Sequence, residues 1–187
     1  MKFLLGAFLI VSLNSLSAPC FAWTPQRLVS LARETVRCEV EHRLAPSTSD
    51  KDAPRAVFVT IERRGKVVGC RGTLRSTQSS LEREVVRAAR SAAAFDPRYR
   101  PLRPEDLKDF AVTVSVVERQ VPLSMGDLAT LAPEEGLVLQ SGERSGIVLP
   151  FEGRDPQTRL SWAWKKAGVA PGSSCRLFRL IAQRFRG

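Results

Sequence analysis

The sequence contains a single histidine, His42, and it lacks the motifs of the large enzyme classes. It has no Rossmann glycine fingerprint, Walker loop, nucleophile elbow or pair of metal-binding carboxylates. Histidine is the most frequent general base, so a nucleophilic side chain in this chain would depend on His42 for that role. The sequence therefore supports none of the common cofactor classes, and we predict no cofactor.

Long apolar runs are confined to the N-terminus. Residues 3–16 are mostly apolar, follow Lys2, and lead to small residues at the positions before a cleavage site after Ala22. No later stretch approaches the length of about 20 apolar residues that a membrane-spanning helix requires. We predict a signal peptide over residues 1–22 and an exported domain over residues 23–187, secreted or periplasmic.

Cysteines are few, and the predicted mature chain keeps an odd number of them: Cys38, Cys70 and Cys175. One internal disulfide at most can form in an oxidising compartment, and the sequence does not determine which pair forms it. Cys38 and His42 have the four-residue spacing of a half-site for a metal. Because no second Cys/His cluster supplies further ligands, we predict no metal site.

Acidic residues are outnumbered, with 19 Asp and Glu against 29 Lys and Arg, which gives a formal net charge of +10. Such a charge favours anionic partners without identifying them. Arg83, Arg87 and Arg90 share one face of a predicted helix and could bind nucleic acid or another polyanion. They lie opposite the apolar face, and no aromatic platform or nucleic-acid motif accompanies them. A solvated helix surface is therefore the favoured interpretation.

The elements that the sequence does contain predict an α+β fold, with an antiparallel sheet and helices packed on it. Residues 110–117 form the strongest strand pattern, and no internal repeat is present. The expected helices cover residues 25–44, the stretch from a capping box at Ser79 and Glu82 to Asp96, and residues 156–167. The other expected strands are 57–61, 67–73, 137–139, 147–149 and 175–185.

Residues 69–73, Gly-Cys-Arg-Gly-Thr, interrupt the second strand of the first predicted hairpin. A glycine inside a strand marks a bulge, a bend or a close approach to the backbone. Two glycines around one cysteine therefore make this stretch the best candidate for a site, and we expect a sharp bend there.

Several segments resemble one family in the same order along the chain: residues 28–36, 57–74, 81–102, 112–117, 136–139, 146–150 and 166–168. This family is the AMMECR domain, also known as component A of AmmeMemoRadiSam systems. The resemblance implies an α+β domain with a larger and a smaller lobe, whose Gly-Cys-x-Gly-Thr turn faces a cleft. It implies a radical-SAM protein and a Memo-type, dioxygenase-like protein as partners, from which an export signal would separate this chain. It implies no established activity.

We expect the cleft to bind a small anionic ligand or a protein partner. It would be formed by residues 69–73, 96–102 and 146–150. An alternative is a Cys70-dependent enzyme, in which backbone N–H groups and Arg71 lower the pKa of the thiol and hold an oxyanion. A third hypothesis is polyanion binding through the arginine face. The candidate ligand-binding residues are Gly69, Cys70, Arg71, Gly72, Thr73, Asp96 and Arg98.

Overall fold

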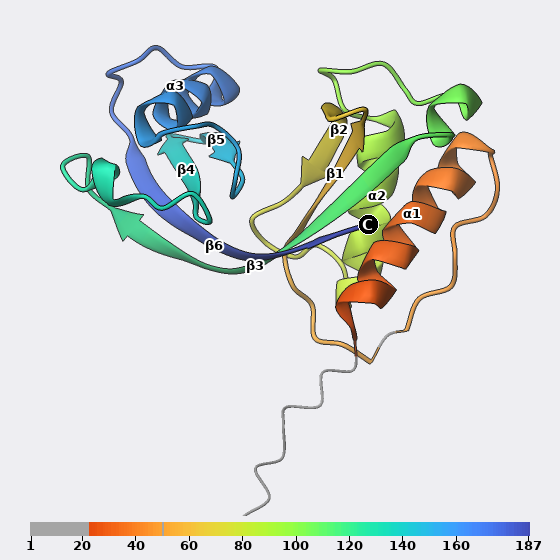
Figure 1. Cartoon of the computed structure of the whole chain (residues 1–187). Coiled ribbons are helices and arrows are strands. Elements are labelled where there is room, and N and C mark those ends of the chain that lie inside the picture. The colour runs from red at the N-terminus through yellow and green to blue at the C-terminus, as the bar shows by residue number, and fades with distance from the viewer. Residues whose placement is uncertain (1–22, 50) are drawn as a thin grey trace, which may run out of the picture.

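The computed structural model describes residues 23–49 and 51–187, so the predicted signal peptide lies outside the described residues. Within them, three α-helices pack on one sheet, which confirms the α+β fold (Figure 1). The elements are α1 (Pro25–Val40), β1 (Val57–Arg63), β2 (Lys66–Gly72), α2 (Leu81–Ala94), η1 (Pro104–Leu107), β3 (Phe110–Leu123), η2 (Leu128–Thr130), β4 (Gly136–Ser141), β5 (Arg144–Val148), α3 (Pro156–Ala167) and β6 (Arg176–Arg186).

The sheet has the strand order β2-β1-β3-β6-β4-β5, and every neighbouring pair is antiparallel. The long strands β3 and β6 pair from Thr113 opposite Arg186 to Leu123 opposite Leu177, so they run through both lobes. Figure 1 shows the sheet curling around this central pair, with β2 and β5 at its two ends.

The larger lobe forms where α1 and α2 cover one face of β1 and β3 (Figure 1). Val57, Val59 and Ile61 alternate along β1 and are fully buried against this helix layer. Such alternation is the period of a strand with one face in the core. Both helices begin at a capping side chain, since Thr24 accepts a hydrogen bond from the Arg27 N–H and Ser80 accepts one from the Arg83 N–H.

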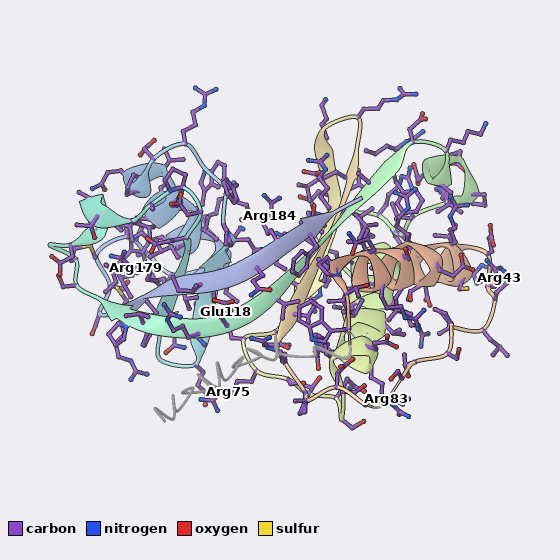
Figure 2. The ribbon with its side chains drawn as sticks, turned by 60° about the horizontal axis from the view of Figure 1, so that its bottom comes forward. Arg43, Arg75, Arg83, Glu118, Arg179 and Arg184 are labelled. Carbon is purple, nitrogen blue, oxygen red and sulfur yellow. The ribbon has the colours of Figure 1, made fainter. Side chains whose placement is uncertain are left out.

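The smaller lobe is built from α3, β4, β5 and the adjoining parts of β3 and β6, around a separate buried cluster. A third cluster lies between the lobes and includes Phe58, Val138 and Leu149. Arg184 of β6 (Figure 2) lies over the ring of Phe151 at 5.2 Å, a cation–π distance. The two lobes therefore share apolar contacts and act as one domain.

Two helix boundaries differ from the sequence expectation. α1 ends at Val40 rather than near residue 44, because His42 takes a positive φ of 54° that a helix cannot continue through. The N-cap of α2 is Ser80, not Ser79. Glu82 accepts two hydrogen bonds from Arg27 and so ties α2 to α1.

None of the helices in the described residues combines the length and the apolar composition needed to cross a bilayer.

Candidate functional site

The predicted bend at residues 69–73 is wrong, because β2 runs as a strand through Gly72 and pairs with β1. The register between β1 and β2 shifts just before Gly69: Ile61 pairs with Gly69, but the next residue of β1, Glu62, pairs with Val67. Gly69 is needed for a different reason. A Cβ there would lie far inside van der Waals contact with the backbone carbonyl of Ala92, so the glycine lets α2 approach the strand.

Strand alternation places Cys70 on the face away from α2. Thr60 stands opposite Cys70 in the register, and its hydroxyl lies 3.2 Å from the Cys70 sulfur. Arg71 follows at the next position, so its side chain leaves the strand on the other face and is exposed. The side chains of Cys70 and Arg71 therefore leave β2 on opposite faces, although both residues border the cleft between the two lobes.

Asp96 and Arg98 hold the outer edge of β2 at Cys70. The backbone N–H of Cys70 donates to Asp96 Oδ2 at 2.8 Å, and Arg98 Nη2 donates to the Cys70 carbonyl at 2.8 Å. Arg98 also donates to both oxygens of Asp96, at 3.0 and 2.8 Å. These side chains replace the neighbouring strand that an edge residue lacks. They therefore position Cys70.

The carboxylate of Asp96 is buried, with 4% of the residue exposed. Burial alone would raise its pKa, but the hydrogen bonds from Arg98 and from the backbone N–H of Cys70 outweigh burial and lower the pKa. Asp96 is therefore ionised at neutral pH and forms a salt bridge with Arg98, whose side chain is 45% exposed.

Thr73 belongs to a different network. Its hydroxyl donates to the Arg75 carbonyl at 2.7 Å and lies 3.3 Å from the buried carboxylate of Glu84. Glu84 also accepts hydrogen bonds from the backbone N–H groups of Thr77 and Gln78, at 2.7 and 3.0 Å. Thr73 thus fixes the loop that leads into α2.

A cleft of about 340 Å³ opens between the lobes, where the two edge strands of the sheet approach each other. Its first wall contains Phe58, Cys70, Arg71, Gly72, Pro97 and Arg98, and its second wall contains Ser145, Ile147, Leu149 and Lys166. The three segments predicted to form the cleft, residues 69–73, 96–102 and 146–150, therefore each contribute residues to its lining. Among the candidate residues, Gly69, Thr73 and Asp96 lie outside its lining.

Lys166 is the principal residue of the cleft that the site prediction missed. It reaches from α3 to the edge of β5, where its Nζ donates to the Ile147 carbonyl at 2.8 Å and to Glu152 Oε2 at 2.7 Å. The strand can lie this close to α3 because Gly146 has no Cβ to meet the Ala163 carbonyl. Lys166 belongs to residues 166–168, a segment that carries the family resemblance, and this resemblance was the sequence feature that could have identified Lys166 as a site residue.

The family model described as AMMECR1 matches residues 29–187. The chain belongs to this family. It is 37% identical over 176 residues to an AMMECR1 relative from Aeropyrum pernix, covering 86% of this chain and 75% of that one. It is 33% identical over 150 residues to a relative from Methanothermobacter thermautotrophicus, covering 70% of this chain and 74% of the other. The resemblance predicted from the sequence is confirmed.

A solved AMMECR1-like fold is that of the uncharacterised protein PH0010 from Pyrococcus horikoshii. It superposes with a TM-score of 0.72 at 24% sequence identity and covers 85% of this chain and 89% of its own. This likeness concerns the fold. The descriptions of these relatives name no activity, so membership of the AMMECR1 family assigns none by itself.

The Cys70 thiol of this AMMECR1 domain lacks the surroundings of an activated nucleophile. Burial is the largest influence and raises the pKa of the thiol, against smaller opposing effects of the Thr60 hydroxyl, Arg98 and Lys166. His42 is exposed beyond the end of α1 and is not part of the cleft lining. Cys70 is therefore an S–H group at neutral pH.

We expect Cys70 to react slowly with iodoacetamide at pH 7.5, because the thiolate is the reactive form. Its alkylation rate should keep rising with pH beyond 9.0, the ordinary thiol value from which its pKa is raised. Mass spectrometry of the peptide that contains Cys70 measures this rate separately from those of Cys38 and Cys175. A rate that levels off below pH 8 would show an activated thiol and restore the enzymatic hypothesis.

The cysteines and the arginine face of the AMMECR1 domain do not form a second site with the cleft residues. Cys38, Cys70 and Cys175 are free thiols, and within residues 23–49 and 51–187 no three His, Cys, Asp or Glu side chains gather as a metal site. On the arginine face, Arg87 pairs with Glu84 and Arg90 pairs with Glu39 at 2.7 Å. Arg83 belongs to the first turn of α2 (Figure 2). Polyanion binding stays a prediction.

Proposed function

We propose that this AMMECR1 domain binds a small anionic ligand in the cleft between its lobes. The observation that carries the proposal is a pair of cations, Arg98 and Lys166, on opposite walls of one cleft of about 340 Å³. This volume is at the lower end of the range for small-molecule sites. Phe58, Ile147 and Leu149 supply apolar walls, as such sites usually have.

Both cations keep donors that the protein does not use. Arg98 directs Nε and Nη2 to Asp96 and to the Cys70 carbonyl, while Nη1 has no hydrogen bond to any described residue. Lys166 uses two of its three N–H groups, on Ile147 and Glu152. An anion between the walls could therefore accept from both cations without displacing their present partners.

The charges at the cleft favour an acceptor-rich ligand of low charge. Asp96 neutralises Arg98 and Glu152 neutralises Lys166, at 2.8 and 2.7 Å, so Arg71 is the one cation of the lining that has no ion pair among the described residues. Because the pKa of Cys70 is raised, its thiol adds no negative charge that would repel an anion. A carboxylate or a phosphate fits this balance.

We place this binding outside the cytoplasm, on the basis of the predicted signal peptide. N-terminal sequencing of protein from an oxidising compartment should begin at Trp23, and a chain that begins at Met1 would contradict export. The partners implied by the family resemblance, a radical-SAM protein and a Memo-type protein, stay a prediction.

We expect acetate or inorganic phosphate to stabilise the domain, and the Lys166→Gln variant to bind that anion about tenfold or more weakly. An anion at 100 times its dissociation constant adds about 2.7 kcal/mol, which raises the melting temperature of a domain of this size by about 5–10 °C. Thermal unfolding against anion concentration, at constant ionic strength, measures both effects.

Lys165→Gln is the matched control, because Lys165 precedes Lys166 in the same helical turn and does not line the cleft. It should bind the anion as the wild type does, and Lys166→Arg should recover part of the affinity. Equal anion affinity in the Lys166→Gln and Lys165→Gln variants would contradict the proposal, as would a complete lack of stabilisation by either anion.

A further inference from the structure

The cleft lies where the two open edges of the sheet meet. β2 and β5 are the terminal strands in the order β2-β1-β3-β6-β4-β5 (Figure 1), and residues of both line the cleft. An edge strand presents backbone N–H and C=O groups that have no neighbouring strand to pair with. The cleft is therefore bordered by two sets of backbone groups as well as by side chains.

On β2, the backbone groups that are free to pair are those of Gly72. The Cys70 N–H and C=O point away from β1, since they bond to Asp96 and Arg98. By alternation, the N–H and C=O of Gly72 point the same way, and no hydrogen bond to them occurs among the described residues. The edge of β2 is thus blocked at Cys70 and open at Gly72.

β5 has the same arrangement. The Leu149 N–H bonds to Glu152 at 3.1 Å, and the Ile147 carbonyl bonds to Lys166, so these outward groups are taken. The Ile147 N–H and the backbone of Ser145 also point outward, and they have no partner in the described part of the chain. The edge of β5 is blocked from Leu149 to the Ile147 carbonyl and open beyond it.

The blocked parts of the two edges lie toward the same end of the sheet. Because all neighbouring strands are antiparallel, β2 and β5 run oppositely along the sheet. Moving from Cys70 to Gly72 therefore follows the same direction as moving from Leu149 to Ser145. An extended chain placed on both open stretches could not continue past the blocked ends. It would end there, beside Arg98 and Lys166.

We propose that the ligand of the cleft is the carboxyl-terminal end of an extended peptide, hydrogen-bonded to the open edges at Gly72 and Ile147, with its carboxylate between Arg98 and Lys166. This inference rests on the proposed binding of an anion and names its chemical class. Strand addition supplies main-chain hydrogen bonds, and the apolar side chains of the cleft take alternate peptide side chains. The cleft volume limits the bound part to a few residues.

The experiment compares four probes by isothermal titration calorimetry with the domain over residues 23–187. They are N-acetyl-trialanine with a free carboxylate, its C-terminal amide, its analogue N-methylated at the central peptide bond, and acetate. The free acid should bind at least tenfold more tightly than each of the other three. In ¹⁵N spectra it should shift the Gly72 and Ile147 amides, and the Gly126 amide should not move.

Each other outcome has a definite meaning. If acetate binds as tightly as the free acid, or the N-methylated analogue binds equally well, anion binding stands and the peptide inference is overturned. If the amide binds as tightly as the acid, the anion proposal itself is wrong. If no probe gives binding that Lys166→Gln weakens and Lys165→Gln preserves, both are overturned.

Discussion

Replacing Gly69 or Gly146 by alanine is expected to destabilise the domain by about 3 kcal/mol or more. Each glycine lies in an edge strand, directly beneath the backbone of the helix that covers its lobe. An added Cβ would collide with the carbonyl of Ala92 in α2 at one position and with that of Ala163 in α3 at the other. A helix backbone cannot rotate aside as a side chain can, so the whole helix would have to move.

Gly126→Ala is the control, because the nearest atom to its added Cβ is the Ser124 oxygen at 3.6 Å and its φ is not positive. Its effect should stay within about 0.5 kcal/mol. Urea unfolding at 25 °C, with the midpoint and slope fitted together, compares the three variants. If Gly69→Ala unfolds at the same midpoint as Gly126→Ala, then α2 does not rest on β2 as described.

Local patterns predicted most elements, and long-range pairing decided where they end. The β-branched run after Phe110 predicts the first half of β3, but Glu118 and Arg119 are polar and suggest that the strand has finished. The structure continues β3 to Leu123, because β6 pairs with it beyond a register shift between Val117 and Arg119. The partner strand lies more than 50 residues later in the sequence, so no local pattern could reveal this extension.

The candidate site was predictable to the same degree. Glycines around Cys70 correctly indicated a close approach to the backbone, but the helix that approaches Gly69 is a matter of packing, and a bend was inferred instead. Cys70 and Arg98 do meet at the cleft. Lys166 and Ser145 face them because the sheet curls (Figure 1) and brings strands from its two ends to one cleft, an arrangement that involves residues far apart in the sequence. The opposite wall therefore could not be derived from the sequence pattern.

Asp96→Asn is expected to lower the free energy of unfolding at pH 7 by about 2–3 kcal/mol and to weaken anion binding in the cleft. The substitution removes the charge that fixes Arg98, and it replaces one of the two oxygens that accept from Arg98 and the Cys70 N–H by an NH2 donor. Arg98 would then be free to leave the wall. Asp109→Asn is the control, because that carboxylate is 62% exposed and its ion pair with Arg64 is long, at 4.0 Å.

The pH dependence of the unfolding free energy distinguishes the contribution of the Asp96 charge from that of its packing. The folded state lowers the pKa of Asp96 from the ordinary 3.8, so this stability is present above that value and is lost as the pH falls below it. Asp96→Asn has no proton to bind at this position. The difference in unfolding free energy between wild type and Asp96→Asn should therefore shrink as the pH falls from 5 towards 2, measured by urea unfolding. A difference that stays constant over this range would mean that the Asp96 side chain contributes through packing and uncharged hydrogen bonds, and that its charge does not hold Arg98 in place.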